Sequence, residues 1–210
     1  MDKIYSNTYK DYLKVIYLLT IGGDRAGTGQ IAEKLHVTPA SVTDMIQRLA
    51  SESPPLVEYQ KYHGVTLTPE GEQVALQVLR HYRLLELFLH EILGYSWDRV
   101  HAEANRLEHA ISEYFGERVA KVLGEPKRGL YGNPIPNQDL EMPEQDIVCL
   151  HDLHPGESGI MHSVWDEDPG LLRHLAKCGL KPGVKLSVLD YSPYDHNLHL
   201  RVEGQEKEVV

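Results

Sequence analysis

The chain has 210 residues, of which 41% are hydrophobic and 25% charged, and its formal net charge is −10. This length suits one large domain or two to three small ones, and no apolar run is long enough to cross a membrane. The two cysteines, Cys149 and Cys178, lie far apart and form no CxxC motif. Together with an N-terminus that lacks a secretory apolar core, this predicts a cytoplasmic protein without a disulfide scaffold or a thiolate zinc site.

The negative charge is unevenly distributed along the chain. Residues 1–80 contain 8 Lys and Arg against 9 Asp and Glu, which leaves 13 against 22 for residues 81–210. Binding to DNA phosphates requires local positive charge and amide donors rather than a basic chain as a whole. The near-neutral N-terminal part is therefore compatible with DNA binding. The acidic remainder and the 12 histidines of the chain supply oxygen and nitrogen ligands for metal ions.

Three helices are predicted in the first 50 residues. Apolar residues at helical spacing indicate a first helix over residues 8–20, and Thr28 is a suitable N-cap for a short second helix. After a tight turn at residues 36–37, Thr38 and Pro39 provide an N-cap and a first-turn proline, which favour the start of a third helix. Two helices joined by so short a turn are typical of a helix-turn-helix.

The polar face of the third helix has the side chains expected of a DNA-recognition helix. Ser and Thr donate hydrogen bonds to phosphates or bases, Gln reads adenine and Ala contacts the methyl group of thymine. Residues 56–60 and 65–68 are predicted to form a β-hairpin wing that meets the DNA backbone or minor groove. The predicted DNA-binding residues are Thr38, Pro39, Ala40, Ser41, Thr43, Asp44, Gln47, Arg48, Lys61 and His63. A helix pair that makes only protein contacts is the alternative, which the order of cap, turn, wing and long following helix disfavours.

The remainder of the chain is predicted to be helical first and then rich in strands. Thr68 and Pro69 begin a long helix that extends to about His90, and a further long helix is expected over residues 95–115. Residues 124–144 are rich in Gly, Pro and Asn and are predicted to be a linker. Beyond the linker, period-two patterns predict a small β-barrel with one helix over about residues 168–177. Its strands are expected at residues 147–150, 158–161, 185–189 and 198–202.

The helix predicted over residues 95–115 carries candidate metal ligands. His101, Asn105, Glu108 and His109 are spaced so that they form one polar stripe beside an apolar stripe. Glu108 and His109 can converge on one cation, with the amide oxygen of Asn105 as a third donor. Such a site has no thiolate, so it suits Mn²⁺ or Fe²⁺ better than a structural Zn²⁺. On spacing alone, ion-paired surface residues are an equally good interpretation, and for His90 that interpretation is preferred.

Several segments resemble the DtxR/MntR family of metal-dependent transcriptional regulators. They are DYLKVIYLL, QIAEKLHVTPASVTDMIQRL, LTPEG, RLLELFLHEILG, HAEANRLEHAIS and YGNPIP, while HPGESG and DEDPGLLRHLAKCGLKPG resemble the family's C-terminal SH3-like (FeoA-like) barrel. The resemblance covers nearly the whole chain. It implies a mainly α fold with small β parts: a winged helix-turn-helix DNA-binding domain at 1–75, a helical metal-binding and dimerisation domain at 76–141, and an SH3-like domain at 142–210.

The resemblance also implies what the protein does. It implies a homodimer, not an enzyme and not attached to a membrane, that binds a palindromic operator in double-stranded DNA and represses metal-uptake genes when metal is bound. Its primary metal ligands would be Asp11, Asn105, Glu108 and His109. Asp11 is typical of manganese-type members, whereas Asn105 departs from the Cys or Glu that usually stands there. Mn²⁺ is therefore expected, with Fe²⁺ as the alternative and one or two ions per subunit.

Two further features follow from the same resemblance. Lys14 stands where manganese-type members can have a second acidic ligand, and its ammonium group is expected to neutralise a nearby carboxylate. The family's second metal site would be retained in altered form. Its candidate ligands are Glu86 and His101, with Tyr82 in place of a histidine, His81 one residue out of register and Asp168 from the barrel.

These ligands suggest a mechanism, and two other classes of function stay open. One ion that joins the first helix to the histidine-bearing helix would set the separation of the recognition helices in a dimer, which must be roughly 34 Å to enter successive major grooves. The alternatives are a helix-turn-helix regulator that senses a small organic ligand, and a metalloenzyme with Glu108 as general base. The sequence lacks an HExxH motif, a nucleophile elbow and a Gly-rich phosphate loop, which disfavours the enzyme.

Overall fold

The computed structural model describes residues 5–143, 147–164, 168–192, 194, 197–205 and 209. It consists of two compact units, each assembled from several parts of the chain. The first unit comprises Met1–Tyr82, Glu108–Ile111 and Pro136–Met142, and the second comprises Arg83–Leu107, Ser112–Ile135 and Pro143–Val210. None of the helices in the described segments combines the length and the apolar character needed to cross a membrane.

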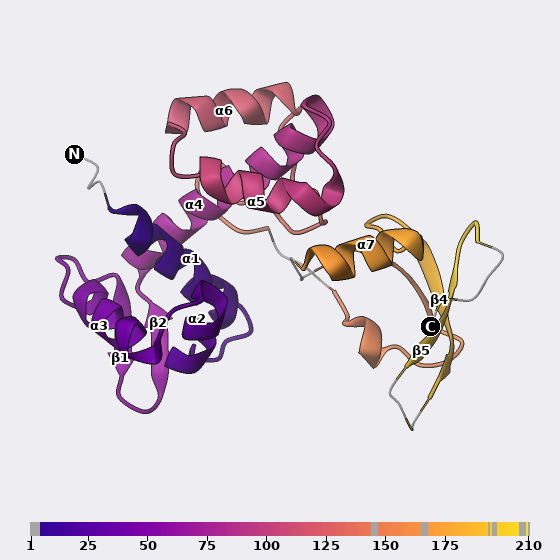
Figure 1. The fold of residues 1–210 in the computed structure, drawn as a ribbon, viewed down its shortest axis with the longest axis horizontal. Helices are drawn as coiled ribbons and strands as arrows, with labels where there is room; N and C mark the ends of the chain where they lie inside the picture. The colour runs from indigo at the N-terminus through magenta and orange to yellow at the C-terminus, as the bar shows by residue number, and fades with distance from the viewer. Residues whose placement is uncertain are drawn as a thin grey trace. The chain divides into compact units, whose positions relative to one another are not determined.

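The first unit contains the predicted winged helix-turn-helix (Figure 1). Its elements are α1 (Asn7–Thr20), α2 (Thr28–Leu35), α3 (Pro39–Ala50), β1 (Val57–Gln60), β2 (Gly64–Leu67) and the greater part of α4 (Pro69–Leu87). Ser6 caps α1 and Thr38 caps α3, each through a side-chain oxygen that accepts from a backbone N–H three residues later. One apolar core joins the three helices and the wing, and it includes Leu13, Ile16, Ile31, Val42, Ile46, Leu49, Leu56 and Val65.

The wing is a short antiparallel hairpin that is anchored to the rest of the first unit. Val57 pairs with Leu67 and Gln60 with Gly64. The backbone N–H and C=O of Val65 bond to Ala26, which precedes α2, at 2.9 Å each. Gly64 has a φ of +96°, and a Cβ at this position would lie 2.6 Å from the Ala26 carbonyl oxygen, so only glycine fits here. These contacts hold the start of β2, next to the turn of the wing, beside the segment that precedes α2.

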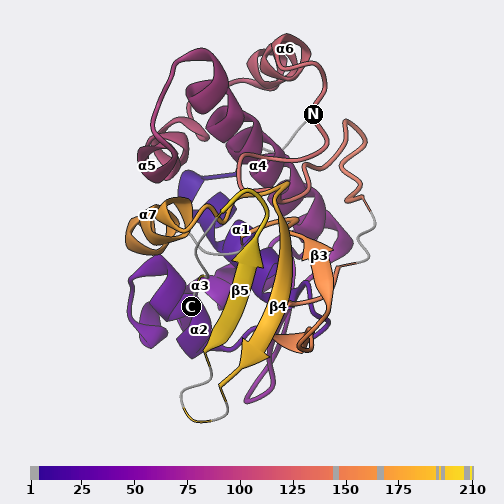
Figure 2. The same cartoon turned by 90° about the vertical axis from the view of Figure 1, so that its right-hand side faces the viewer.

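The second unit contains the remaining helices and a three-stranded sheet (Figure 2). A π-helical turn, η1 (Phe88–Ile92), continues α4 and is followed by α5 (Trp97–Leu107) and α6 (Glu113–Val122). Further along lie a 3-10 turn, η2 (Leu150–Asp152), and then β3 (Ser158–Ile160), α7 (Pro169–Lys177), β4 (Lys185–Tyr191) and β5 (Leu198–Val202). The strands form an antiparallel sheet in the order β3-β4-β5, whose core is Leu180, Leu186, Val188, Leu200 and Val202.

Two predicted elements are wrong. The helix expected over residues 95–115 is two helices, because α5 ends at Leu107 and the Ser112 side chain caps α6 by accepting from the N–H of Phe115 at 3.2 Å. The strand expected over residues 147–150 is absent: residues 147–149 are irregular and Leu150 begins η2. Its apolar side chains are exposed, 66% in the case of Val148, so no described segment of the chain buries the face that a strand needs. The predicted linker forms no helix or strand over residues 124–143, and Glu144 lies outside the described residues.

Candidate metal centre

Three of the four predicted primary ligands lie together in the first unit. Asp11 lies on α1, and Glu108 and His109 lie in the turn over residues 108–111 between α5 and α6. One donor atom from each of them lies within 4.8 Å of the other two. His109 Nε2 is 2.7 Å from Asp11 Oδ1 and 3.6 Å from Glu108 Oε1. The three side chains can therefore share one small cation.

The end of α5 explains why these ligands meet. The helix stops at Leu107 and Ser112 caps α6, and the four residues between them, 108–111, belong to the first unit. Glu108 is buried there, with only 4% of its surface exposed. Burial raises the pKa of Glu108, and the nearby Lys14 ammonium opposes this rise without cancelling it.

Lys14 neutralises the buried carboxylate, as expected from its position. Its Nζ atom lies 2.6 Å from Glu108 Oε1 and 4.6 Å from the centre of the Tyr82 ring, in the position of a cation–π contact. The side chains of Lys14 and Glu108 are 11% and 1% exposed. An isolated carboxylate at this depth would carry a large desolvation cost, so the ion pair is what makes its burial tolerable in the absence of metal.

Two buried polar atoms of this cluster have no hydrogen-bond partner among the described residues. They are Glu108 Oε2 and His109 Nδ1. Buried polar atoms are rarely left unpaired unless an ion or a water molecule completes them. Carboxylate oxygens and imidazole nitrogens are the ligands of Mn²⁺ and Fe²⁺, so the residues present fit such an ion. The nitrogen that binds an ion must carry no proton, so ion binding by Nε2 would replace its hydrogen bond to Asp11.

The fourth predicted ligand, Asn105, lies in the last turn of α5 and belongs to the second unit. Its Nδ2 atom is 3.0 Å from His101 Nε2, and His101 Nδ1 is 3.6 Å from Glu86 Oε1. The structure thus brings together Glu86 and His101, two candidates for the second site, with Asn105 beside them. Of the other second-site candidates, His81 and Tyr82 lie on α4, the helix that also carries Glu86, and Asp168 caps α7 by accepting from Gly170 N–H at 2.8 Å. Their part in a second site stays a prediction.

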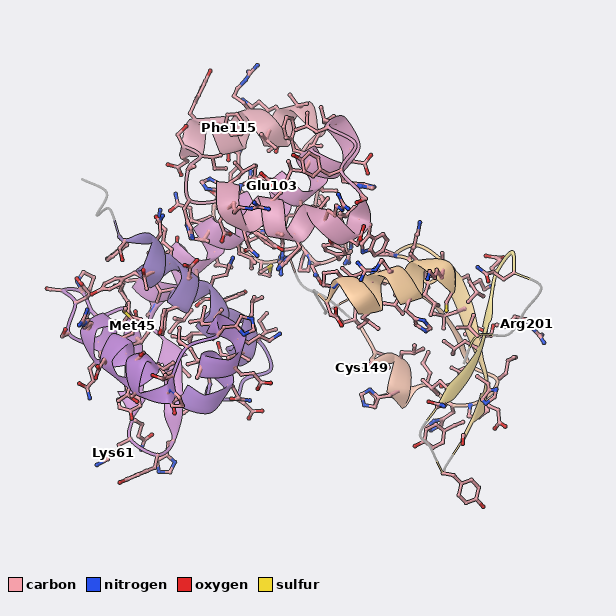
Figure 3. The ribbon with its side chains drawn as sticks, in the orientation of Figure 1. Met45, Lys61, Glu103, Phe115, Cys149 and Arg201 are labelled. Atoms are coloured by element: carbon pink, nitrogen blue, oxygen red, sulfur yellow. The ribbon has the colours of Figure 1, made fainter. Side chains whose placement is uncertain are left out.

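One further group of donors was not predicted from the sequence. Cys149, His151 and Asp152 offer ligand atoms within 4.8 Å of one another, and all three are exposed. His151 Nε2 lies 3.1 Å from Asp152 Oδ1. Figure 3 shows Cys149 at the start of the short η2 turn. The available signal is the C-x-H-D spacing, which a search for CxxC motifs alone does not detect.

The predicted DNA-binding residues lie on α3 and on the wing. All those predicted on α3 and its cap are exposed except Thr43, which is half-buried and donates its hydroxyl proton to the Pro39 carbonyl at 3.0 Å. Lys61 lies at the tip of the wing (Figure 3), and both His63 and the intervening Tyr62 are exposed. A shallow pocket between α3 and the wing is lined by Thr43, Tyr59, Lys61 and Tyr62, among others. The exposed surface of α3 and the wing thus carries polar side chains and the two cationic residues Arg48 and Lys61.

Known families match almost the whole chain in three successive parts. Residues 5–65 match the family described as the N-terminal DNA binding domain of the iron dependent repressor. Residues 68–137 match its metal binding and dimerisation domain, and residues 148–208 match the FeoA domain. The order of these parts agrees with the predicted order of domains.

Individual relatives point the same way. The iron-dependent repressor IdeR of Mycobacterium tuberculosis is 36% identical over 194 residues, which cover 87% of this chain and 84% of the relative. The regulator MntR of Lysinibacillus sphaericus is 35% identical over 114 residues, 54% of this chain and 80% of the relative. A solved structure of a manganese-dependent transcriptional repressor in complex with manganese has a TM-score of 0.89 and 34% identity, and covers 96% of this chain and 92% of its own. The chain therefore belongs to the DtxR/MntR family of metal-dependent transcriptional regulators, which are DNA-binding repressors and not enzymes.

Proposed function

We propose that Asp11, Glu108 and His109 hold the regulatory metal ion of this repressor. The observation that carries the proposal is the convergence of one donor from α1 and two from the turn over residues 108–111. An ion bound there would supply two positive charges next to two carboxylates, one of which is buried with an unpartnered oxygen. Asn105, which lies one helical turn before Glu108, is kept as the proposed fourth ligand.

Mn²⁺ is the metal that this donor set favours. The three donors are two carboxylates and an imidazole, and no thiolate or thioether is among them. Hard oxygen ligands suit Mn²⁺, while nitrogen ligands are shared with Fe²⁺, which is the alternative. Relatives named for manganese and for iron are both known, so the family alone leaves this choice open. A second ion at Glu86 and His101 is a separate proposal, supported by their 3.6 Å pairing.

The ion would act on DNA binding through α1. Leu13 and Ile16 of α1 belong to the same core as Ile31 of α2 and Val42 of α3. An ion that ties Asp11 to the 108–111 turn would therefore restrain the whole helix-turn-helix relative to that turn. In a two-fold dimer this restraint would favour recognition helices about one DNA turn apart, roughly 34 Å, as a palindromic operator requires. Coupling of this kind is reciprocal, so DNA must tighten metal binding by the same factor.

In this proposal the regulated genes are those for metal uptake, which are repressed in the cytoplasm when metal is plentiful. The test begins by enriching DNA from a random duplex pool with the Mn²⁺-loaded protein. Affinity for the enriched duplex is then measured by fluorescence anisotropy with Mn²⁺, with anaerobic Fe²⁺ and with a chelator. The chelator should weaken binding by about 5- to 150-fold, the usual range of such coupling.

Two variants assign that effect to the site. Glu108→Gln should bind DNA weakly with or without metal, while its circular dichroism spectrum stays that of the wild type. Glu103→Gln is the matched control, because it removes the same charge from α5, where Glu103 pairs only with Arg106 at 3.1 Å among the contacts described. DNA binding that does not change with the chelator would refute metal control, and a metal response retained by Glu108→Gln would refute this site.

A further inference from the structure

One oxygen of the buried Glu108 carboxylate is already occupied by a cation of the protein itself. Lys14 lies one turn beyond Asp11 on α1, and its Nζ is 2.6 Å from Glu108 Oε1. The same oxygen lies 3.6 Å from His109 Nε2. The ammonium group therefore lies within the group of ligands, on the oxygen that faces the imidazole nitrogen.

The charges of the cluster show what this contact does to an incoming metal ion. With a neutral imidazole, Asp11, Glu108 and Lys14 sum to one negative charge, whereas the two carboxylates alone would match a divalent ion. An ammonium beside a bound divalent ion repels it, and in a site this poorly exposed the repulsion is only weakly screened. Metal binding at Glu108 Oε1, the oxygen 3.6 Å from His109 Nε2, is therefore an exchange of one cation for another.

The Tyr82 ring beside Lys14 offers a second contact for the displaced ammonium. Its distance to the centre of the Tyr82 ring is 4.6 Å, and a lysine has a flexible four-carbon stem. The ammonium can thus swing away from Oε1 and keep a favourable contact with the ring face. A small movement of one side chain is enough to free the oxygen.

We infer that Lys14 is a built-in competitor of the regulatory metal for Glu108, and that it sets the metal concentration at which the protein responds. This inference rests on the proposed metal centre. Without metal, Lys14 stabilises the buried carboxylate, and with metal it is expelled from Oε1. The chain would consequently need more metal to be activated than it would with an uncharged residue at this position.

The test is a calorimetric titration of the chelator-treated, full-length protein with MnCl₂. Lys14→Gln removes the competing charge and should lower the dissociation constant by about tenfold or more, because a unit charge beside the ion is removed. Lys10→Gln is the matched control, since it removes the same charge one turn earlier on α1, and it should change the constant less than about twofold. Lys14→Arg should weaken Mn²⁺ binding, because a guanidinium can bond both carboxylate oxygens, including the unpartnered Oε2.

Thermal unfolding supplies a second readout that does not depend on DNA. Metal-free Lys14→Gln should melt at a lower temperature than the wild type. Mn²⁺ should raise the Tm of Lys14→Gln by more than it raises the Tm of the wild type, because the variant binds the ion more tightly. The inference is wrong if Lys14→Gln binds Mn²⁺ no more tightly than the wild type, or if Lys14→Arg binds it equally well. If the wild type binds no Mn²⁺, or binds it no more tightly than Glu108→Gln does, the proposed metal centre itself is wrong.

Discussion

His109 Nε2 lies 2.7 Å from Oδ1 of Asp11, although 98 positions separate the two residues in the chain. The contact joins α1, which packs in the core of the helix-turn-helix, to the short turn over residues 108–111. A metal ion replacing the shared proton would turn a hydrogen bond into a stronger, metal-dependent link at the same place.

The carboxylate of Asp11 is therefore expected to contribute directly to metal affinity. Asp11→Asn keeps the size of the side chain but removes its charge, and should raise the dissociation constant for Mn²⁺ by about tenfold or more. Asp24→Asn is the control, because Asp24 is exposed in the loop between α1 and α2. Isothermal titration with MnCl₂ measures both variants. Equal Mn²⁺ affinities of the wild type and Asp11→Asn would show that Asp11 is not a metal ligand.

The sequence was sufficient to predict the elements of the first unit, because local signals and tertiary packing agree there. The cap and proline at Thr38 and Pro39 do begin α3, and Val42 and Ile46, which follow them at helical spacing, are fully buried. The break after Leu107 was missed although Ser112 is an ordinary N-cap, because the apolar period continues across it. That break creates the turn that carries Glu108 and His109.

The centre itself was only partly predictable. Helical spacing could group Glu108 and His109, but Asp11 came from family resemblance, since no local pattern relates α1 to a turn almost 100 residues later. The unpartnered Oε2 and the 2.6 Å contact of Lys14 depend on tertiary packing, which spacing does not encode. Likewise, the alternating pattern at residues 147–150 predicted a strand, yet these apolar side chains are exposed and no part of the described structure covers them.

The two elements predicted to contact DNA, α3 and the wing, should respond differently to mutation. Lys61 lies at the tip of the wing, where we predict that it contacts a phosphate. Lys61→Ala should therefore weaken binding to all duplexes alike and reduce the salt slope of log K by about one. Gln47 is exposed on α3, and Gln47→Ala should cost about 1–3 kcal/mol on the preferred duplex and relax its specificity. Anisotropy at several salt concentrations separates the two effects. If Lys61→Ala leaves the salt slope unchanged, Lys61 does not contact a phosphate.

The junction between the wing and α4 should tolerate no side chain at Gly71. This residue lies in the first turn of α4, where a Cβ would overlap the backbone carbonyl of Leu56. Gly71→Ala should therefore destabilise the protein by about 1–3 kcal/mol, as overpacking does. Gly29→Ala is the contrasting control: a Cβ at position 29 would meet no atom within 4 Å, so this change should stabilise α2 by up to about 1 kcal/mol. Urea unfolding of both variants checks the pair, and equal stability of Gly71→Ala and the wild type would contradict the packing described.

Within the second unit, α5 and α7 are joined by an ion pair whose pH dependence can be measured. Arg173 Nη1 lies 3.0 Å from Asp98 Oδ2, and this hydrogen bond is the main reason that the pKa of Asp98 is lowered from its ordinary 3.8, with a smaller effect of Ser96. Because the folded-state pKa is the lower one, the stabilisation is present above the ordinary pKa and is lost as the pH falls through the lowered value. Arg173→Gln should move the titration midpoint of Asp98 upward, toward that of an unpaired aspartate.

Carbon-13 NMR of the Asp98 carboxyl group between acid and neutral pH measures this midpoint. Arg106→Gln is the control, because Arg106 lies on the same helix but pairs with Glu103. Comparing the wild type with Arg173→Gln also tests whether the ion pair persists in solution. An ion pair that forms only rarely between exposed side chains cannot shift the titration midpoint of Asp98. If Asp98 titrates identically in the wild type and in Arg173→Gln, the pair does not form in solution. The packing of α5 against α7 must then rest on other contacts, such as the apolar cluster in which Trp97 of α5 packs with Leu172 and Leu175 of α7.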